Sequence, residues 1–149
     1  MSLETFRYAV IMLFAGVGIP IMAVLNTQLG RGIGSPAAAA TVLFTVALVA
    51  TAIVMFFTSG PAPLQLIATQ PSYLLLAGFG VVFYVLSVTW IAPRFGIGNA
   101  VFCVLLGQMI AATAIDHLGL FGAMVKPLSV LRASGVGLMV LGVLFIQKG

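Results

Sequence analysis

Five long apolar runs constrain what this sequence can fold into. A helix that crosses a bilayer needs about 20 mainly apolar residues. Runs near that length, separated by Gly, Pro or charged residues, cover approximately residues 8–26, 37–57, 73–92, 99–117 and 131–146. Because a helix satisfies its own backbone hydrogen bonds, lipid can surround it. The sequence therefore predicts an all-α integral membrane protein, with five transmembrane helices in a single domain over residues 1–149.

The composition excludes several other classes of protein. Only 5% of the residues are charged and 62% are hydrophobic, whereas soluble domains are roughly 25% charged. The net charge of +4 comes from basic residues that lie far apart in sequence, so no nucleic-acid-binding patch is expected. The single cysteine, Cys103, lies inside an apolar run. It leaves no intrachain disulfide and no Cys/His metal cluster, and we expect no metal or cofactor.

The basic residues are shared equally between the two sides of the predicted helices. Five crossings put the termini on opposite sides, which we call side one (the N-terminal side) and side two. Side one receives Arg7, Lys126 and Arg132, and side two receives Arg31, Arg94 and Lys148. The positive-inside rule then favours neither orientation. A chain that inserts both ways can supply the inverted repeats of a transporter from one polypeptide, although loops and unequal spans offer an alternative way to fix a single orientation.

A few polar residues inside the runs are candidates for binding a solute, because polar groups in lipid need a partner or a task. Gln108 lies midway along the fourth run, where its amide suits a neutral or zwitterionic solute. Tyr84 lies near the middle of the third run and shares a helical face with Ser87. Asn26 lies near the side-two end of the first run. Interhelical hydrogen bonding or packing is the alternative for each, so the predicted substrate-binding residues are Gln108, Tyr84, Asn26 and Ser87.

Asp116 is the only acidic residue besides Glu4. It lies near the side-one end of the fourth run, on the same side as Lys126 and Arg132. One interpretation is a salt bridge, and the other is a carboxylate that carries a coupling proton. The neighbouring His117 is more typical of an interface residue without a special role. Since no nucleophile elbow or metal-ligand spacing accompanies these residues, we do not expect an enzyme.

Proline and small residues mark candidate bends and contacts. Pro20 cannot donate to the carbonyl of Gly16, and Gly18 lies between them, so a kink or partial unwinding is expected, with either a gating or an architectural role. Small residues allow helices to approach closely in lipid. At helical spacing they form stripes on the fourth and fifth runs, which predict helix or dimer contacts through Gly107, Ala111, Gly135 and Gly142.

Taken together, several short motifs resemble one superfamily over essentially the whole chain. They are Gly18-Ile19-Pro20 with Asn26, Gly78-Phe79-Gly80, Ala92-Pro93-Arg94-Phe95-Gly96, Gly107-Gln108 with Asp116, and Pro127 with Arg132 and Gly135. This pattern resembles the drug/metabolite transporter superfamily, and within it the small five-helix YdcZ-like proteins of the bacterial-type inner membrane.

The resemblance implies an antiparallel dimer of half-size units that encloses a central cavity, similar to the two halves of larger ten-helix transporters. The expected partners are the lipid bilayer, a small-molecule solute, and a second copy of the chain or a paralogue. The expected function is secondary transport by alternating access; a membrane scaffold, an assembly partner of another five-helix subunit and a passive channel are the alternatives. Related small multidrug exporters carry a glutamate in their first helix. The run 8–26 has no acid, so proton-coupled export of drug cations by that route is not expected.

Overall fold

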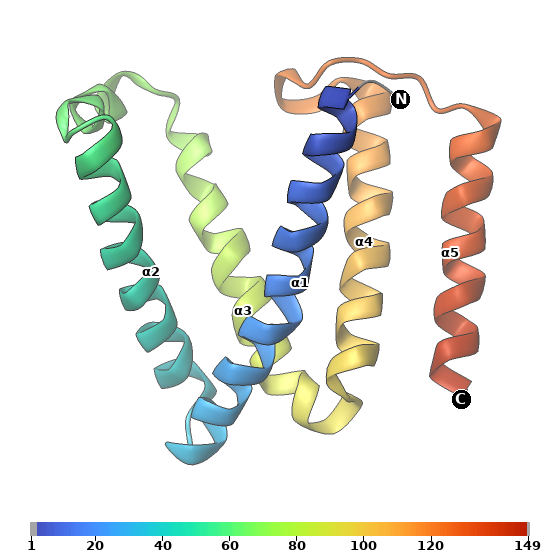
Figure 1. The fold of residues 1–149 in the computed structure, drawn as a ribbon, viewed down its shortest axis with the longest axis horizontal. Coiled ribbons are helices and arrows are strands. Elements are labelled where there is room, and N and C mark those ends of the chain that lie inside the picture. Colours follow the sequence, from blue (N-terminus) through green and yellow to red (C-terminus); the bar gives the residue numbers. More distant parts are fainter. Residues whose placement is uncertain (1–2, 149) are drawn as a thin grey trace. The chain divides into compact units, whose positions relative to one another are not determined.

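The computed structural model describes residues 3–148, which form helices and contain no strand (Figure 1). The five long helices are α1 (Leu3–Gly32), α2 (Pro36–Thr58), α3 (Ala77–Phe95), α4 (Ile97–Leu118) and α5 (Val130–Lys148). Three short 3-10 segments are η1 (Ala62–Thr69), η2 (Ser72–Leu76) and η3 (Leu120–Gly122). Five helical segments, with η2 and α3 counted as one, are long and apolar enough to cross a membrane. The prediction of an all-α protein with five candidate transmembrane helices is confirmed.

All five helices extend past the C-terminal ends expected from the sequence, and α1 and α3 extend the furthest. α1 continues six residues beyond Asn26 to Gly32. α3 includes Pro93 and ends at Phe95. The break follows at Gly96, whose φ of 88° is a left-handed conformation that favours glycine. A proline in the last turn therefore does not end this helix, and the glycine after it does.

The helix α1 also continues through Pro20, and every residue from Leu3 to Gly32 is helical. The expected partial unwinding at Gly16 and Gly18 is not observed. Pro20 still lacks an N–H, so the carbonyl of Gly16 loses its usual intrahelical partner. A gating role for this position stays a prediction.

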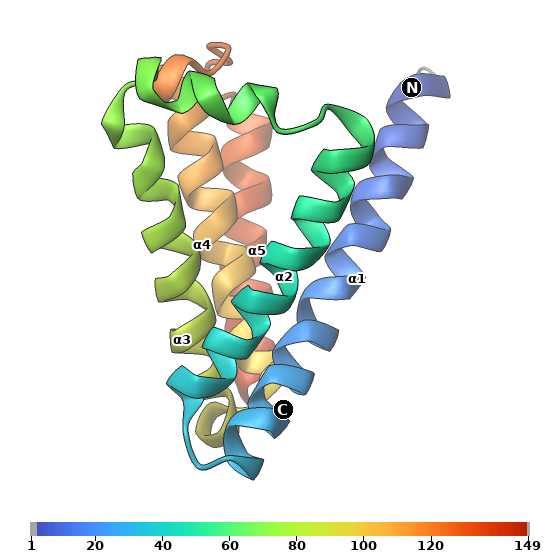
Figure 2. The same ribbon diagram turned by 90° about the vertical axis from the view of Figure 1, so that its left-hand side faces the viewer.

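The chain divides into two compact units, α1–α3 up to Arg94 and α4–α5 from Phe95, and each is described by itself. In the first unit, α1, α2 and α3 draw together at their side-two ends (Figures 1 and 2). The buried residues are at this end of each helix: Ala23, Asn26, Thr27, Gly30, Ala39, Ala40, Val85, Val88, Thr89 and Ala92. The core of the unit is therefore at one end. Whether the whole chain acts as a single domain stays a prediction.

Small side chains make this close approach possible. A Cβ on Gly30 would lie 3.3 Å from the Thr89 Cγ2 atom and 3.4 Å from the Pro36 Cα atom, so any larger residue would push the helices apart. The turn between α1 and α2 is equally tight. Gly34 has a φ of 72°, and the Ser35 hydroxyl caps α2 by accepting a hydrogen bond from the Ala38 N–H at 3.2 Å.

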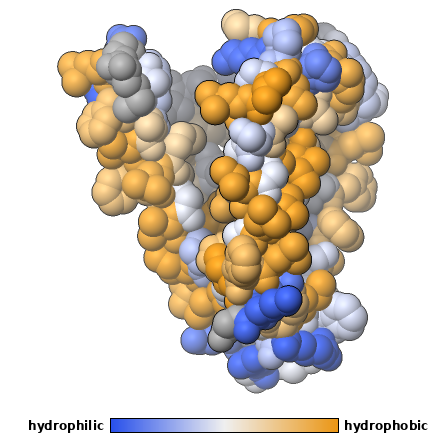
Figure 3. Space-filling view, turned by 90° about the vertical axis from the view of Figure 1, so that its right-hand side faces the viewer, coloured by the Kyte–Doolittle hydropathy of each residue, from blue (hydrophilic) through white to orange (hydrophobic). Residues whose placement is uncertain are grey.

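In the second unit α4 packs against α5. At side one, Gly119 ends α4 in a left-handed conformation, with a φ of 63° and its N–H donating to the Ile115 carbonyl. At side two, the Gln147 Nε2 atom donates to the Cys103 sulfur at 3.2 Å. Figure 3 shows hydrophobic residues between hydrophilic ends on the face that carries α5, as expected for a surface in contact with lipid.

The predicted glycine contacts do not hold α4 and α5 together. A Cβ added to Gly107, Gly135 or Gly142 would meet no atom within 4 Å. Ala111 is exposed. These small residues are therefore free to contact another helix or a second copy of the chain. Their role in dimer packing stays a prediction.

Candidate functional site

A buried polar pair joins α1 to α3 near side two. The Asn26 Nδ2 atom donates to the Thr89 hydroxyl at 2.7 Å, and that hydroxyl donates to the Val85 carbonyl, also at 2.7 Å. Asn26 is 4% exposed and Thr89 is 3% exposed. The structure therefore gives Asn26 the interhelical hydrogen bond that the sequence left as an alternative. Its Oδ1 atom is also buried, without a partner among the described residues.

Sequence reasoning missed both Thr89 and Thr27. Threonine in a helix usually satisfies its own hydroxyl by donating to the carbonyl four residues earlier. Six helical threonines do so here: Thr41, Thr45, Thr51, Thr58, Thr89 and Thr113. Thr27 does not, and its hydroxyl is buried without a partner in the described part of the chain. A usable signal for Thr89 was its spacing from Val85 and Ala92, which places all three on one helical face.

Replacing Thr89 with valine is expected to destabilise the first unit. Valine keeps the shape of the side chain but leaves the Asn26 amide buried with no acceptor, which costs about 1–3 kcal/mol. Thermal unfolding of the purified protein in detergent measures the loss. The variant Thr51→Val is the matched control, because the exposed Thr51 hydroxyl contacts only its own helix. Equal stability of the two variants would mean that the pair contributes nothing.

The other two predicted substrate-binding residues of the first unit, Tyr84 and Ser87, lie on α3 near Thr89. Tyr84 and Ser87 are half-buried, and the Tyr84 hydroxyl is buried without a partner among the described residues. They border the face formed by Val85, Thr89 and the other buried α3 residues. No hydrogen bond within residues 3–148 joins Tyr84 or Ser87 to Asn26. Gln108, in the second unit, is exposed midway along α4.

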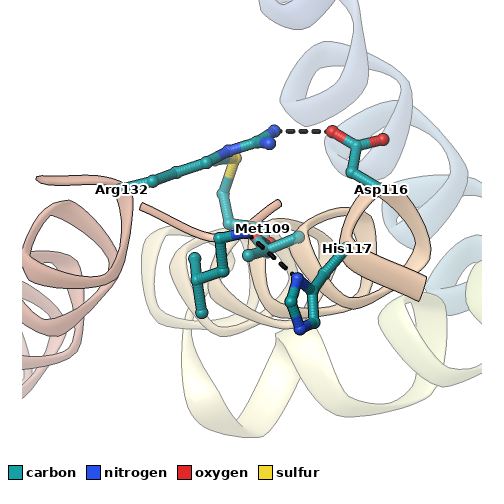
Figure 4. A network of polar contacts seen from close by, with 6 residues as sticks. Met109, Asp116, His117 and Arg132 are labelled. Carbon is teal, nitrogen blue, oxygen red and sulfur yellow. Dashed lines mark hydrogen bonds and ion pairs between the residues drawn. The ribbon is translucent and has the colours of Figure 1, made fainter. Parts of the chain in front are cut away.

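A network of polar contacts ties the start of α5 to the end of α4. The Arg132 Nη2 atom donates to Asp116 Oδ2 at 2.7 Å, and the two side chains are 36% and 30% exposed (Figure 4). The His117 Nδ1 atom accepts a hydrogen bond from the Leu128 N–H at 3.1 Å. The Lys126 N–H donates to the Asp116 carbonyl at 2.8 Å. This geometry is the salt bridge that the sequence suggested, with His117 holding the loop.

Cavities border several of these residues. One of about 390 Å³ lies between α1 and α2, with Gly18 and Asn26 in its otherwise largely apolar wall. Another of about 380 Å³ lies between α4 and α5, with Thr113 and His117 among its lining residues. Both volumes are in the range of small-molecule sites, about 300–1,000 Å³. Each unit therefore has an open, largely apolar groove beside a predicted or neighbouring polar residue.

Comparison with known proteins places the chain. No curated protein and no solved structure matches it. The family model described as "Putative inner membrane exporter, YdcZ" matches residues 7–145, which is nearly the whole chain. That family is a class of transporters and not of enzymes. With its five apolar helices, the chain belongs to the YdcZ family of membrane transporters and is a multi-pass protein of the inner membrane.

Proposed function

We propose that this protein is a secondary transporter that moves a small solute by alternating access, as an antiparallel dimer of two copies of the chain. The observation that carries the proposal is the equal division of basic residues over five crossings. The helix bounds keep that division, because every basic side chain lies near a helix end or in a loop. Side one has Arg7, Lys126 and Arg132, and side two has Arg31, Arg94 and Lys148. Neither orientation is favoured by charge.

Gln108 supports a solvent-filled cavity in such a dimer. Its amide is exposed near the middle of α4 and has no hydrogen-bond partner among residues 3–148. An amide in that position facing lipid would be costly, whereas an amide facing water or a solute is satisfied. The open Cβ positions of Gly107, Gly135 and Gly142 leave a smooth surface for a second copy. In the proposal Gln108, Tyr84 and Ser87 contact the solute, and Asn26 holds α1 against α3 through its buried pair with Thr89.

The salt bridge bears on the proton-coupling hypothesis. Asp116 already has a charged partner in Arg132 and helps to fix the start of α5. A structural role accounts for these contacts without a coupling proton. The transport proposal therefore does not depend on Asp116.

The proposal is tested by measuring orientation and flux together. A reporter fused to the N-terminus should be detected on both sides of the membrane in similar amounts. Proteoliposomes loaded with a cell extract of small metabolites, read by mass spectrometry against protein-free liposomes, should release at least one solute with saturable kinetics.

Three results would contradict the proposal in different ways. Detection of the reporter on one side only would exclude a dimer of oppositely oriented copies. Release that does not saturate would indicate a passive channel. No release, together with copurification of one membrane partner, would indicate a scaffold.

A further inference from the structure

The side-two end of the first unit contains a cavity that two arginines border. Its volume is about 340 Å³, and Arg31, Arg94, Trp90 and Thr27 are among the residues that line it. Arg31 comes from the last turn of α1 and Arg94 from the last turn of α3. The packing of α1 against α3 therefore brings together two guanidinium groups that lie 63 residues apart in the sequence.

Neither guanidinium group has a counter-charge among residues 3–148. The Arg31 Nη2 atom donates to the Pro93 carbonyl at 3.4 Å, and the Arg94 Nη1 atom donates to the Trp90 carbonyl at 3.0 Å. A guanidinium has five N–H donors, so each keeps donors to spare. Both acids of the sequence, Glu4 and Asp116, belong to side one, and the one ion pair among residues 3–148 is Asp116 with Arg132. Two like charges at one cavity repel each other unless an anion joins them.

Three further features distinguish this cavity from a helix end that merely carries an arginine. The Arg94 guanidinium carbon lies 5.0 Å from the centre of the Trp90 ring, which holds the side chain against the cavity wall. Thr27 is 6% exposed, and its hydroxyl has no partner in the described chain. Pro36, the first residue of α2, also lines the cavity, so the positive end of the α2 dipole is at this site.

Interaction with the helix ends alone does not account for this arrangement. The C-terminal ends of α1 and α3 favour nearby cations, and an interfacial arginine can extend its head group into water. Those effects need only one hydrogen bond to a carbonyl, or none. They leave unexplained why two guanidinium groups share one cavity with an unpaired buried hydroxyl.

We propose that Arg31 and Arg94 form a clamp for an oxyanion of the phosphate type, with the Thr27 hydroxyl as an additional donor after rotation about its χ1 bond. Guanidinium groups match the oxygen geometry of phosphate through paired N–H donors. The phosphate belongs to an anionic lipid headgroup or to a soluble molecule. The clamp does not depend on the transport function, because its charges and cavity lie within one copy of the chain.

The protein carries its own probe for this site, since Trp90 is the single tryptophan of the sequence. An anion that draws Arg94 away from the ring should change Trp90 emission. Purified full-length protein is titrated with inorganic phosphate in lipid-free detergent, and separately reconstituted in phosphatidylcholine nanodiscs with increasing phosphatidylglycerol. Sodium chloride at matched ionic strength corrects for screening. A saturable change with phosphate identifies a soluble anion, and a change with phosphatidylglycerol alone identifies the lipid headgroup.

Charge-removing variants show whether the response comes from the clamp. Arg31→Gln keeps the stack of Arg94 on Trp90 and should weaken binding about tenfold or more, because it removes charge-assisted hydrogen bonds. Lys148→Gln removes the same charge on the same side of the membrane and should leave binding unchanged. The proposal is overturned if neither probe changes Trp90 emission beyond the chloride control. It is also overturned if Arg31→Gln and Lys148→Gln titrate alike.

Discussion

Two variants with opposite charge bias should each lose transport when produced alone and regain it when produced together. Gln65→Lys with Gln70→Lys raises side one to five basic residues against three, and both glutamines are exposed outside α2 and α3. Arg7→Gln with Lys126→Gln lowers side one to one basic residue against three. Lys and Arg near helix ends set orientation. Each variant should therefore insert in one orientation, opposite to the other, and lack its inverted partner.

The readouts are the N-terminal reporter and release of the solute identified with the wild-type protein. Gln65→Ser with Gln70→Ser alters the same positions without charge and should behave as wild type. Release by either biased variant alone, with its reporter confined to one side, would show that transport needs no inverted copy. Failure of the coproduced pair, with both variants inserted in opposite orientations and folded, would show that an inverted pair is not sufficient for transport.

Replacing Gln108 with leucine should abolish solute release while leaving the protein inserted and folded. Leucine has a similar size but offers no hydrogen bond, so a site built around the amide loses its polar contact. If Gln108 faced lipid instead, the same substitution would remove an unsatisfied amide from hydrocarbon, and it would stabilise the protein without changing release. The two interpretations therefore predict opposite outcomes from one variant.

Release from proteoliposomes and thermal unfolding should be measured on the same preparation. Gln65→Leu is the matched control, because Gln65 is also exposed but lies in η1, outside the long helices. Unchanged release from the Gln108→Leu protein, together with a higher unfolding temperature, would remove Gln108 from the site.

The helices could be located from the sequence because the length of an apolar run is itself the physical requirement for crossing a bilayer. Their ends were harder to predict, since a helix end depends on local backbone geometry. Proline and glycine together were expected to break the third helix over residues 93–96, yet α3 includes Pro93 and ends just before the left-handed Gly96. Gly30 and Gly32 looked like loop residues, yet α1 includes them, and Gly30 is in the helix contact with Thr89.

The candidate sites could be predicted only where a residue type is rare. Asp116 stands out because the sequence has only two acids. A salt bridge was one of the two interpretations of Asp116, and the structure pairs it with Arg132. Asn26 stands out because it is a polar residue in an apolar run. Thr89 and Thr27 do not stand out, because threonine is common in these helices and its hydroxyl usually donates to a carbonyl of its own helix. The shared cavity of Arg31 and Arg94 depends on how α1 packs against α3, which no spacing in the sequence encodes.

The one-ended core of the first unit has a consequence for how a pair of chains would move. Within each copy, α1, α2 and α3 contact one another where Gly30, Ala39 and Thr89 meet. In the proposed alternating-access mechanism, this contact would be the point about which the helices pivot. In an antiparallel pair, the two copies would place this contact at opposite surfaces of the membrane. An inverted pair would then possess two hinges of identical construction, one for each gate, encoded by a single gene.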